Sequence, residues 1–86
     1  RTAQDHYVNG QFNEAIKTAE RARDRGASAS RAWRIIGSSA CNIPDLRLAQ
    51  EAYRRGDGQA RQFMVYVCQK QGIAHTGTRF EKVDGT

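Results

Sequence analysis

The side chains best suited to chemistry in this chain are two arginines and a serine on one predicted helix. Arg31, Arg34 and Ser38 follow at spacings of three and four, which places them on one helix face. A guanidinium offers a planar fork of donors that matches a carboxylate, and a hydroxyl adds a further donor. The pattern fits the binding of an acidic group, although arginines so placed also serve simply to solvate a helix.

The other reactive side chains are scattered along the sequence. His6 and His75 stand alone, and the Ser38-Ser39 pair has no sequence partner that would act as a base. An enzyme needs a nucleophile with its base, or paired carboxylates. We therefore expect no catalytic, cofactor-binding or metal-binding residues in this chain.

Cys41 and Cys68 lie 27 residues apart, with no second Cys or His at metal-ligand spacing. Both fall on apolar faces of predicted helices, which favours two buried thiols in a reducing compartment. A disulfide between the two helices is the alternative, and its geometry requires coordinates to judge. We expect a cytoplasmic location for this part of the protein.

Length and charge narrow the classes of function. The chain has 86 residues, enough for one domain, and 14 Lys and Arg against 9 Asp and Glu give a net charge of +5. This balance fits a solvated helical surface or a basic face for an acidic peptide. Basic and aromatic residues do not interleave as in single-strand binders, so no nucleic acid is expected. No apolar run approaches the ~20 residues of a membrane helix, and no membrane contact is expected. The chain begins at Arg1 within a repeat, which indicates a piece of a longer protein.

The elements that position these residues are helices. The single proline, Pro44, and glycines at helix ends predict an all-α protein with short turns. Helices are expected over residues 1–9, 11–25, 30–42, 44–55 and 58–71. Ser28 or Ser30 should cap the third helix, Pro44 should begin the fourth, and Asp57 should cap the fifth. Residues 74–86 lack periodicity and are expected to be a flexible tail, ordered only if Phe80 or Val83 is held.

Apolar residues define the buried face of each helix. The third is expected to bury Trp33 and Gly37, and a mid-helix glycine implies a close helix neighbour. The fifth carries an amphipathic stripe made of Ala60, Phe63, Met64, Val67 and Cys68. Val65 and Tyr66 lie off this stripe and should leave some apolar surface exposed.

The first four helices echo each other at a spacing of 34 residues. The matched pairs are Ala3 and Gly37, Tyr7 and Cys41, Phe12 and Leu46, Ala15 and Ala49, and Ala19 and Tyr53. A 34-residue period is typical of stacked helix-turn-helix units.

The second unit resembles a tetratricopeptide repeat at Trp33, Ile36, Gly37, Ala40, Ala49 and Tyr53. It departs from that pattern in having Ala40 where an aromatic is common and Gly56 in place of a late alanine. The first unit is similar at Ala3, Gly10, Phe12, Ala15 and Ala22. The resemblance implies repeat 1 at about 1–26, repeat 2 at about 30–56 and a capping helix at about 58–72, in a right-handed superhelical stack over residues 1–73.

A narrower pattern resembles the helical C-terminal region of serine/threonine protein kinases from myxobacteria and related bacteria. It runs through Tyr7-x2-Gly10-x-Phe12-x2-Ala15, Gly37-x3-Cys41-x3-Asp45-x3-Ala49-x3-Tyr53 and Arg61-x6-Cys68-x3-Gly72-Ile73. The chain contains none of the kinase's own motifs. The resemblance implies that ATP binding and catalysis reside elsewhere in a parent chain, which in this family often also carries a membrane span.

The tetratricopeptide resemblance also implies a partner-binding groove lined by the first helix of each repeat. Its residues would be Gln4, Tyr7, Val8, Arg31, Arg34, Ser38 and Asn42. The expected function is a non-catalytic module that binds a protein or peptide, acidic if the arginines make the contact. The alternative is a structural end-cap of a longer solenoid or a self-association domain, in which unburied helix faces meet another copy.

Overall fold

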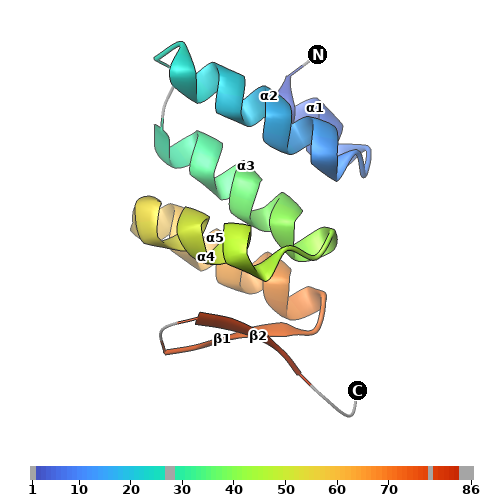
Figure 1. Cartoon of the computed structure of the whole chain (residues 1–86), viewed down its shortest axis with the longest axis vertical. Coiled ribbons are helices and arrows are strands. Elements are labelled where there is room, and N and C mark those ends of the chain that lie inside the picture. The colour runs from blue at the N-terminus through green and yellow to red at the C-terminus, as the bar shows by residue number, and fades with distance from the viewer. Residues whose placement is uncertain (1, 27–28, 78, 84–86) are drawn as a thin grey trace.

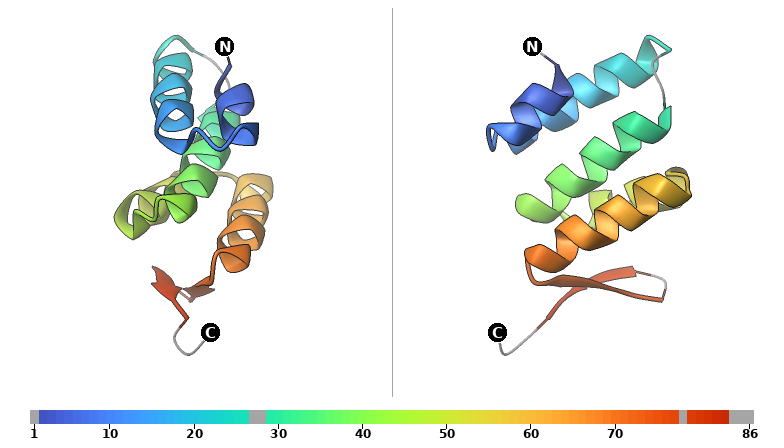
Figure 2. Two further views of the ribbon diagram at one scale, coloured as in Figure 1. Left: turned by 90° about the vertical axis from the view of Figure 1, so that its right-hand side faces the viewer. Right: turned by 180° about the vertical axis from the view of Figure 1, so that it is seen from behind.

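The computed structural model describes residues 2–26, 29–77 and 79–83, and these are mostly helical, as predicted. The elements are α1 (Ala3–Val8), α2 (Phe12–Asp24), α3 (Ala29–Asn42), α4 (Leu46–Arg55), α5 (Gly58–Lys70), β1 (Ile73–Thr76) and β2 (Arg79–Lys82). They stack along the 40 Å axis of the molecule in chain order (Figure 1). The pair α1–α2 occupies one end, α3 the middle, and α4 and α5 lie side by side above the β1–β2 hairpin, as Figure 2 also shows.

Local capping determines where several helices begin. The Asp57 carboxylate accepts from the Ala60 amide at 2.9 Å, which confirms it as the cap of α5. Asp45 caps α4 in the same way through the Leu48 amide at 3.1 Å. The predicted start of α4 at Pro44 is therefore wrong by two residues, because Asp45 satisfies the first free amides.

The start of α3 also differs from the sequence-based expectation. The helix begins at Ala29, so Ser30 lies inside it and is not its cap. Ser28 lies outside the described residues.

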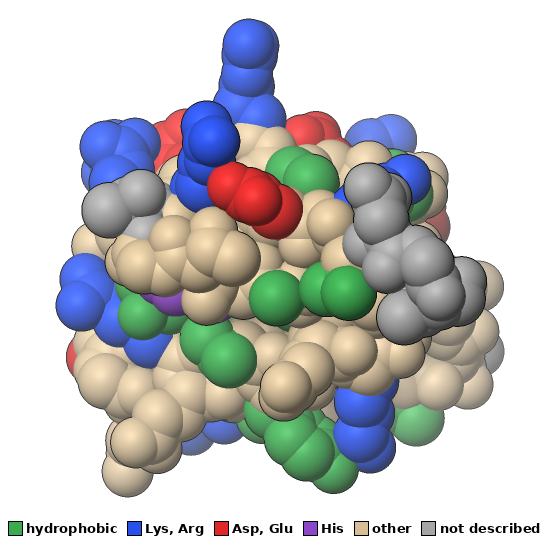
Figure 3. All heavy atoms as spheres, turned by 90° about the horizontal axis from the view of Figure 1, so that it is seen from below, with side chains coloured by type: hydrophobic (Ala, Val, Ile, Leu, Met, Phe, Trp, Pro, Cys, Tyr) green, Lys and Arg blue, Asp and Glu red, His purple; other side chains and the backbone are tan. Residues whose placement is uncertain are grey.

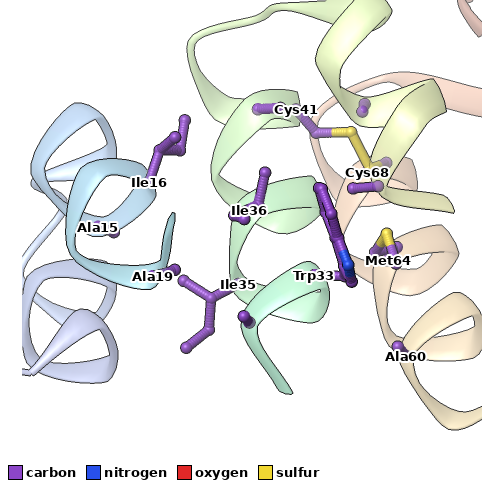
Figure 4. Close-up of a cluster of buried hydrophobic side chains, with 14 of the residues drawn as sticks. Ala15, Ile16, Ala19, Trp33, Ile35, Ile36, Cys41, Ala60, Met64 and Cys68 are labelled. Carbon is purple, nitrogen blue, oxygen red and sulfur yellow. A yellow bond between two sulfur atoms is a disulfide. The ribbon is translucent and has the colours of Figure 1, made fainter. Parts of the chain in front are cut away.

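Helix α3 is the centre of the core and packs against all four other helices. Trp33 is 7% exposed and Ile36 is fully buried. Figure 4 shows both between the alanines of α2 on one side and Met64 of α5 on the other. A Cβ on Gly37 would overlap the Met64 sulfur and come within 3.1 Å of Ala52. The close approach predicted for this glycine is thus made by α4 and α5 together.

Cys41 and Cys68 form a disulfide that joins the carboxyl-terminal halves of α3 and α5 (Figure 4). Both residues are almost completely buried, as expected, but the prediction of two free thiols is wrong. The two helices pack side by side and bring residues 27 positions apart to a Cα separation of 5.2 Å. The argument for a reducing compartment rested on free thiols and therefore loses its basis.

Strands β1 and β2 pair as an antiparallel hairpin with Ile73 opposite Lys82, where the sequence predicted a tail from residue 74 onward. Phe80 is 4% exposed and lies edge-on to Tyr53 of α4, with ring centroids 5.6 Å apart. His75 stacks on the same tyrosine at 4.0 Å. The sequence predicted that this segment would be ordered only if Phe80 or Val83 were held, and these contacts hold Phe80. Tyr53 is consequently half-buried and contacts the hairpin, beyond its expected role between paired helices.

Candidate functional site

The seven residues predicted to line a groove lie on α1 and α3, which are in contact. Gln4 and Arg31 line one cleft of about 310 Å³ together with the buried side chain of Ile35. Val8 is 70% exposed at the other end of α1. The structure thus brings the first helices of the two predicted repeats into one surface.

Tyr7 forms the centre of this surface and is half-buried between helices. Burial raises the pKa of its phenol, and the neighbouring Ser38 hydroxyl and Lys70 ammonium oppose that rise. Helices α1 and α5 both pack against α3, and Figure 2 shows the three on one side of the molecule. The face therefore spans three helices, α1, α3 and α5.

Two of the predicted groove residues are unsuited to contact a partner. Ser38 is fully buried, and its Oγ forms no hydrogen bond of good geometry although the Tyr7 phenol is close. Asn42 donates its side-chain amide to the Ser38 carbonyl at 2.9 Å, within its own helix. The Ser38 hydroxyl is therefore covered in this structure, because the adjoining helices cover that side of α3, and its role in binding stays a prediction.

Arg31 and Arg34 line a second cleft, of about 180 Å³, between the first turns of α3 and α5. Asp57 and Gln59 of α5 line it too. Hydrogen bonds from the Ala60 amide and from Ser30 hold the pKa of Asp57 below its ordinary value, and the nearby Arg34 contributes. A carboxylate of the protein itself therefore already lies near the two arginines, so an acidic ligand would have to compete with it for Arg34.

Helix α5 adds exposed aromatic surface to the predicted groove, whose own aromatic residue, Tyr7, is half-buried. Phe63 is 37% exposed and lies under the Arg34 guanidinium at 5.3 Å, although it was assigned to the buried stripe. Tyr66 is 56% exposed, as its position off the stripe suggested, and the Lys70 ammonium lies 4.5 Å from its ring. Residues 59, 63, 66 and 70 recur at helical spacing, so reading α5 as the first helix of a further repeat would have found them.

The histidines make local contacts in this structure. His6 Nδ1 lies 2.9 Å from the Gln11 side-chain oxygen, and His75 stacks on Tyr53. Within residues 2–26, 29–77 and 79–83, no three His, Cys, Asp or Glu side chains gather in a way that could hold a metal ion. No described helix has both the length and the apolar character needed to cross a bilayer.

The surface of α1, α3 and α5 thus offers exposed apolar groups, two aromatic rings and three cations. These side chains suit the recognition of another polypeptide, because aromatic and arginine residues contribute much of the binding free energy at protein interfaces. No family model, curated protein or solved structure significantly matches the chain.

Proposed function

We propose that this chain is a non-catalytic interaction module that binds a peptide segment of a partner protein across the face of α1, α3 and α5. The observation that carries the proposal is the continuity of that face. Gln4 of α1 and Arg31 of α3 share one cleft, and Arg34 of α3 lies over Phe63 of α5. Three helices therefore present one surface of mixed apolar and basic character.

The surface favours a partner that has both apolar and acidic side chains. Phe63 and Tyr66 would be covered by apolar groups, which gains about 25 cal/mol per Å² of apolar area buried. Arg31 and Lys70 at its margins would attract carboxylates and orient the segment. A purely acidic peptide would leave the aromatic rings in water and is expected to bind more weakly.

We further propose that α1–α2 and α3–α4 are two tetratricopeptide-like repeats in a right-handed stack, with α5 as the capping helix. The equivalent residues Ala15 and Ala49 are both fully buried, which agrees with the 34-residue echo. The proposal that this module belongs to a bacterial serine/threonine kinase rests on the sequence pattern alone. Sequence upstream of Arg1 containing a kinase catalytic loop would test it.

The test of peptide binding begins with selection from a displayed peptide library. The affinity of the best peptide is then measured by calorimetry for the wild type and for Arg31→Glu/Arg34→Glu. We expect this variant to bind about tenfold or more weakly, because attraction is replaced by repulsion. Arg21→Glu/Arg25→Glu, which carries the same charge change at the carboxyl-terminal end of α2, is the matched control and should bind like the wild type. Equal binding by the wild type and the α3 variant would refute the proposal.

A second candidate, the structural end-cap, is favoured by the hairpin. Ile73 and Phe80 are buried where β1 and β2 cover α5 and α4, so this end of the stack is closed by its own chain. Such a terminal cover is what a solenoid needs at its last repeat. Light scattering across a range of concentrations distinguishes self-association from this role, since a capped end predicts a monomer.

A further inference from the structure

A separate basic cleft lies between the outer side of α4 and strand β2. Arg47 and Arg54 are seven residues apart on α4, about 10 Å along the helix axis. They line one cleft of about 530 Å³ with Arg79 of β2. Figure 3 views this end of the molecule and shows basic side chains at its rim, acidic side chains among them and apolar side chains nearer the centre. Two elements distant in sequence thus direct three arginines to one place.

The acidic residues beside this cleft are already paired with other groups. Glu51 pairs with Arg55 at 3.2 Å, and Glu81 pairs with Arg79 at 2.8 Å. Among the described residues, no hydrogen bond or ion pair involves the side chains of Arg47 and Arg54. The cleft therefore retains two uncompensated positive charges.

The cleft also contains an unsatisfied polar group and an apolar floor. Gln50 Oε1 is buried without a hydrogen-bond partner. Leu46 is half-buried and Phe80 is nearly covered, and both line the cleft. A ligand that fits must supply negative charge and some apolar surface.

Strand β2 presents free backbone groups on the side away from β1. The Val83 amide donates to the Gly72 carbonyl at 2.8 Å, which fixes the alternation of hydrogen-bonded pairs along the hairpin. In that alternation the N–H and C=O groups of Phe80 and Lys82 point away from β1. An edge strand of this kind can pair with a further extended chain.

We propose that this cleft binds an extended acidic peptide, which adds to the hairpin as a third strand beside β2 and pairs its carboxylates with Arg47 and Arg54. Backbone pairing and an apolar floor suit a peptide better than a nucleic acid, since Phe80 is too buried to stack with a base. A second copy of this chain would bring its own arginines against these and be repelled. The cleft is separate from the α1–α3–α5 face, so an experiment can refute peptide binding at one site and leave the other unaffected.

The experiment uses a fluorescein-labelled eight-residue peptide that alternates glutamate and valine, with binding followed by fluorescence anisotropy. We expect Arg47→Glu/Arg54→Glu to weaken binding by about tenfold or more. Arg21→Glu/Arg25→Glu carries an equal charge change at the carboxyl-terminal end of α2, away from both proposed sites, and should bind like the wild type. Thermal melts confirm that each variant folds. Unchanged binding by the α4 variant would overturn the proposal.

The same assay distinguishes strand addition from simple charge attraction. A peptide that is N-methylated at alternate residues keeps its charge but cannot pair as a strand, and it should bind about tenfold or more weakly. Equal binding by both peptides overturns strand addition. Stronger binding of an eight-nucleotide single-stranded DNA at the same arginines would assign the cleft to nucleic acid and also overturn the proposal. If the protein forms a concentration-dependent dimer that the peptide dissociates, the cleft is instead an interface between two copies of this chain, and the proposal is again overturned.

Discussion

Breaking the Cys41–Cys68 disulfide should markedly destabilise this domain. The bond closes a loop between residues 27 positions apart. By the chain-entropy relation, a loop of this length stabilises the native state by about 3.5 kcal/mol at 25 °C, because it restricts the unfolded chain. A domain of this size changes its melting temperature by about 4–8 °C per kcal/mol, so the reduced form should melt roughly 14–28 °C lower.

The assay compares urea unfolding of the oxidised protein with that of protein reduced while denatured and then refolded in dithiothreitol. Reduction under denaturing conditions is needed because both sulfur-bearing residues are buried and a reductant reaches them poorly. The double variant Cys41→Ala/Cys68→Ala is the control, and dithiothreitol should leave its unfolding curve unchanged.

Two results would refute this reasoning. The first is two titratable thiols in the denatured, unreduced protein, which would show that the bond is absent. The second is an oxidised and a reduced protein with the same free energy of unfolding. That outcome would mean that the unfolded chain already holds these two segments together, so that closing the loop has little effect.

Three further predictions concern packing and caps. Gly37→Ala should lower the free energy of unfolding by about 1–3 kcal/mol through overlap with Met64, offset in part by about 1 kcal/mol of helix propensity. Gly58→Ala, whose Cβ would meet no atom within 4 Å, should not destabilise the protein, and urea unfolding of both variants tests the contrast. Phe80→Ala should cost roughly 3–5 kcal/mol and remove hydrogen-exchange protection from the β1 amides, whereas retained protection would show that the hairpin holds without the ring. The lowered pKa of Asp57 means that its stabilising effect is full above the free value of 3.8 and is lost as the pH falls through the folded pKa. Wild type and Asp57→Asn should therefore converge in melting temperature at low pH, and a constant difference would contradict the cap assignment.

The two proposed surfaces have different physical requirements. The α1–α3–α5 face has exposed aromatic rings, and its cations Arg34 and Lys70 already contact these rings. Peptide binding to this face should therefore depend mainly on apolar contact, and its affinity should change only modestly with salt. The α4–β2 cleft has two arginines without an ion-pair partner among the described residues. Peptide binding to this cleft should therefore weaken steeply as the salt concentration rises, because salt screens the arginine charges. Measuring the affinity of each site for its own peptide at two salt concentrations would distinguish the two sites in one protein preparation.

The sequence by itself determined the helices, because helix formation depends on residues within one or two turns. The stripe of α2 and the Asp57 cap are local signals, and the helices lie within two residues of their predicted bounds. Gly37 likewise predicted a closely packed neighbouring helix, since a glycine within a helix lowers its stability and is expected only where another element packs against it. The sequence also indicated Arg31 and Arg34 as surface residues on one side of α3.

Only the tertiary structure decided which faces and chain segments meet. The disulfide required the ends of α3 and α5 to lie side by side, and the hairpin required Tyr53 to receive Phe80. The rotation of α5 about its axis exposed Phe63, and the packing of α1 over α3 buried Ser38. Each of these outcomes depends on contacts between residues far apart in the chain, which no local periodicity encodes. For the same reason, the cleft that joins α4 to β2 became visible only when Arg79 was placed beside Arg47 and Arg54.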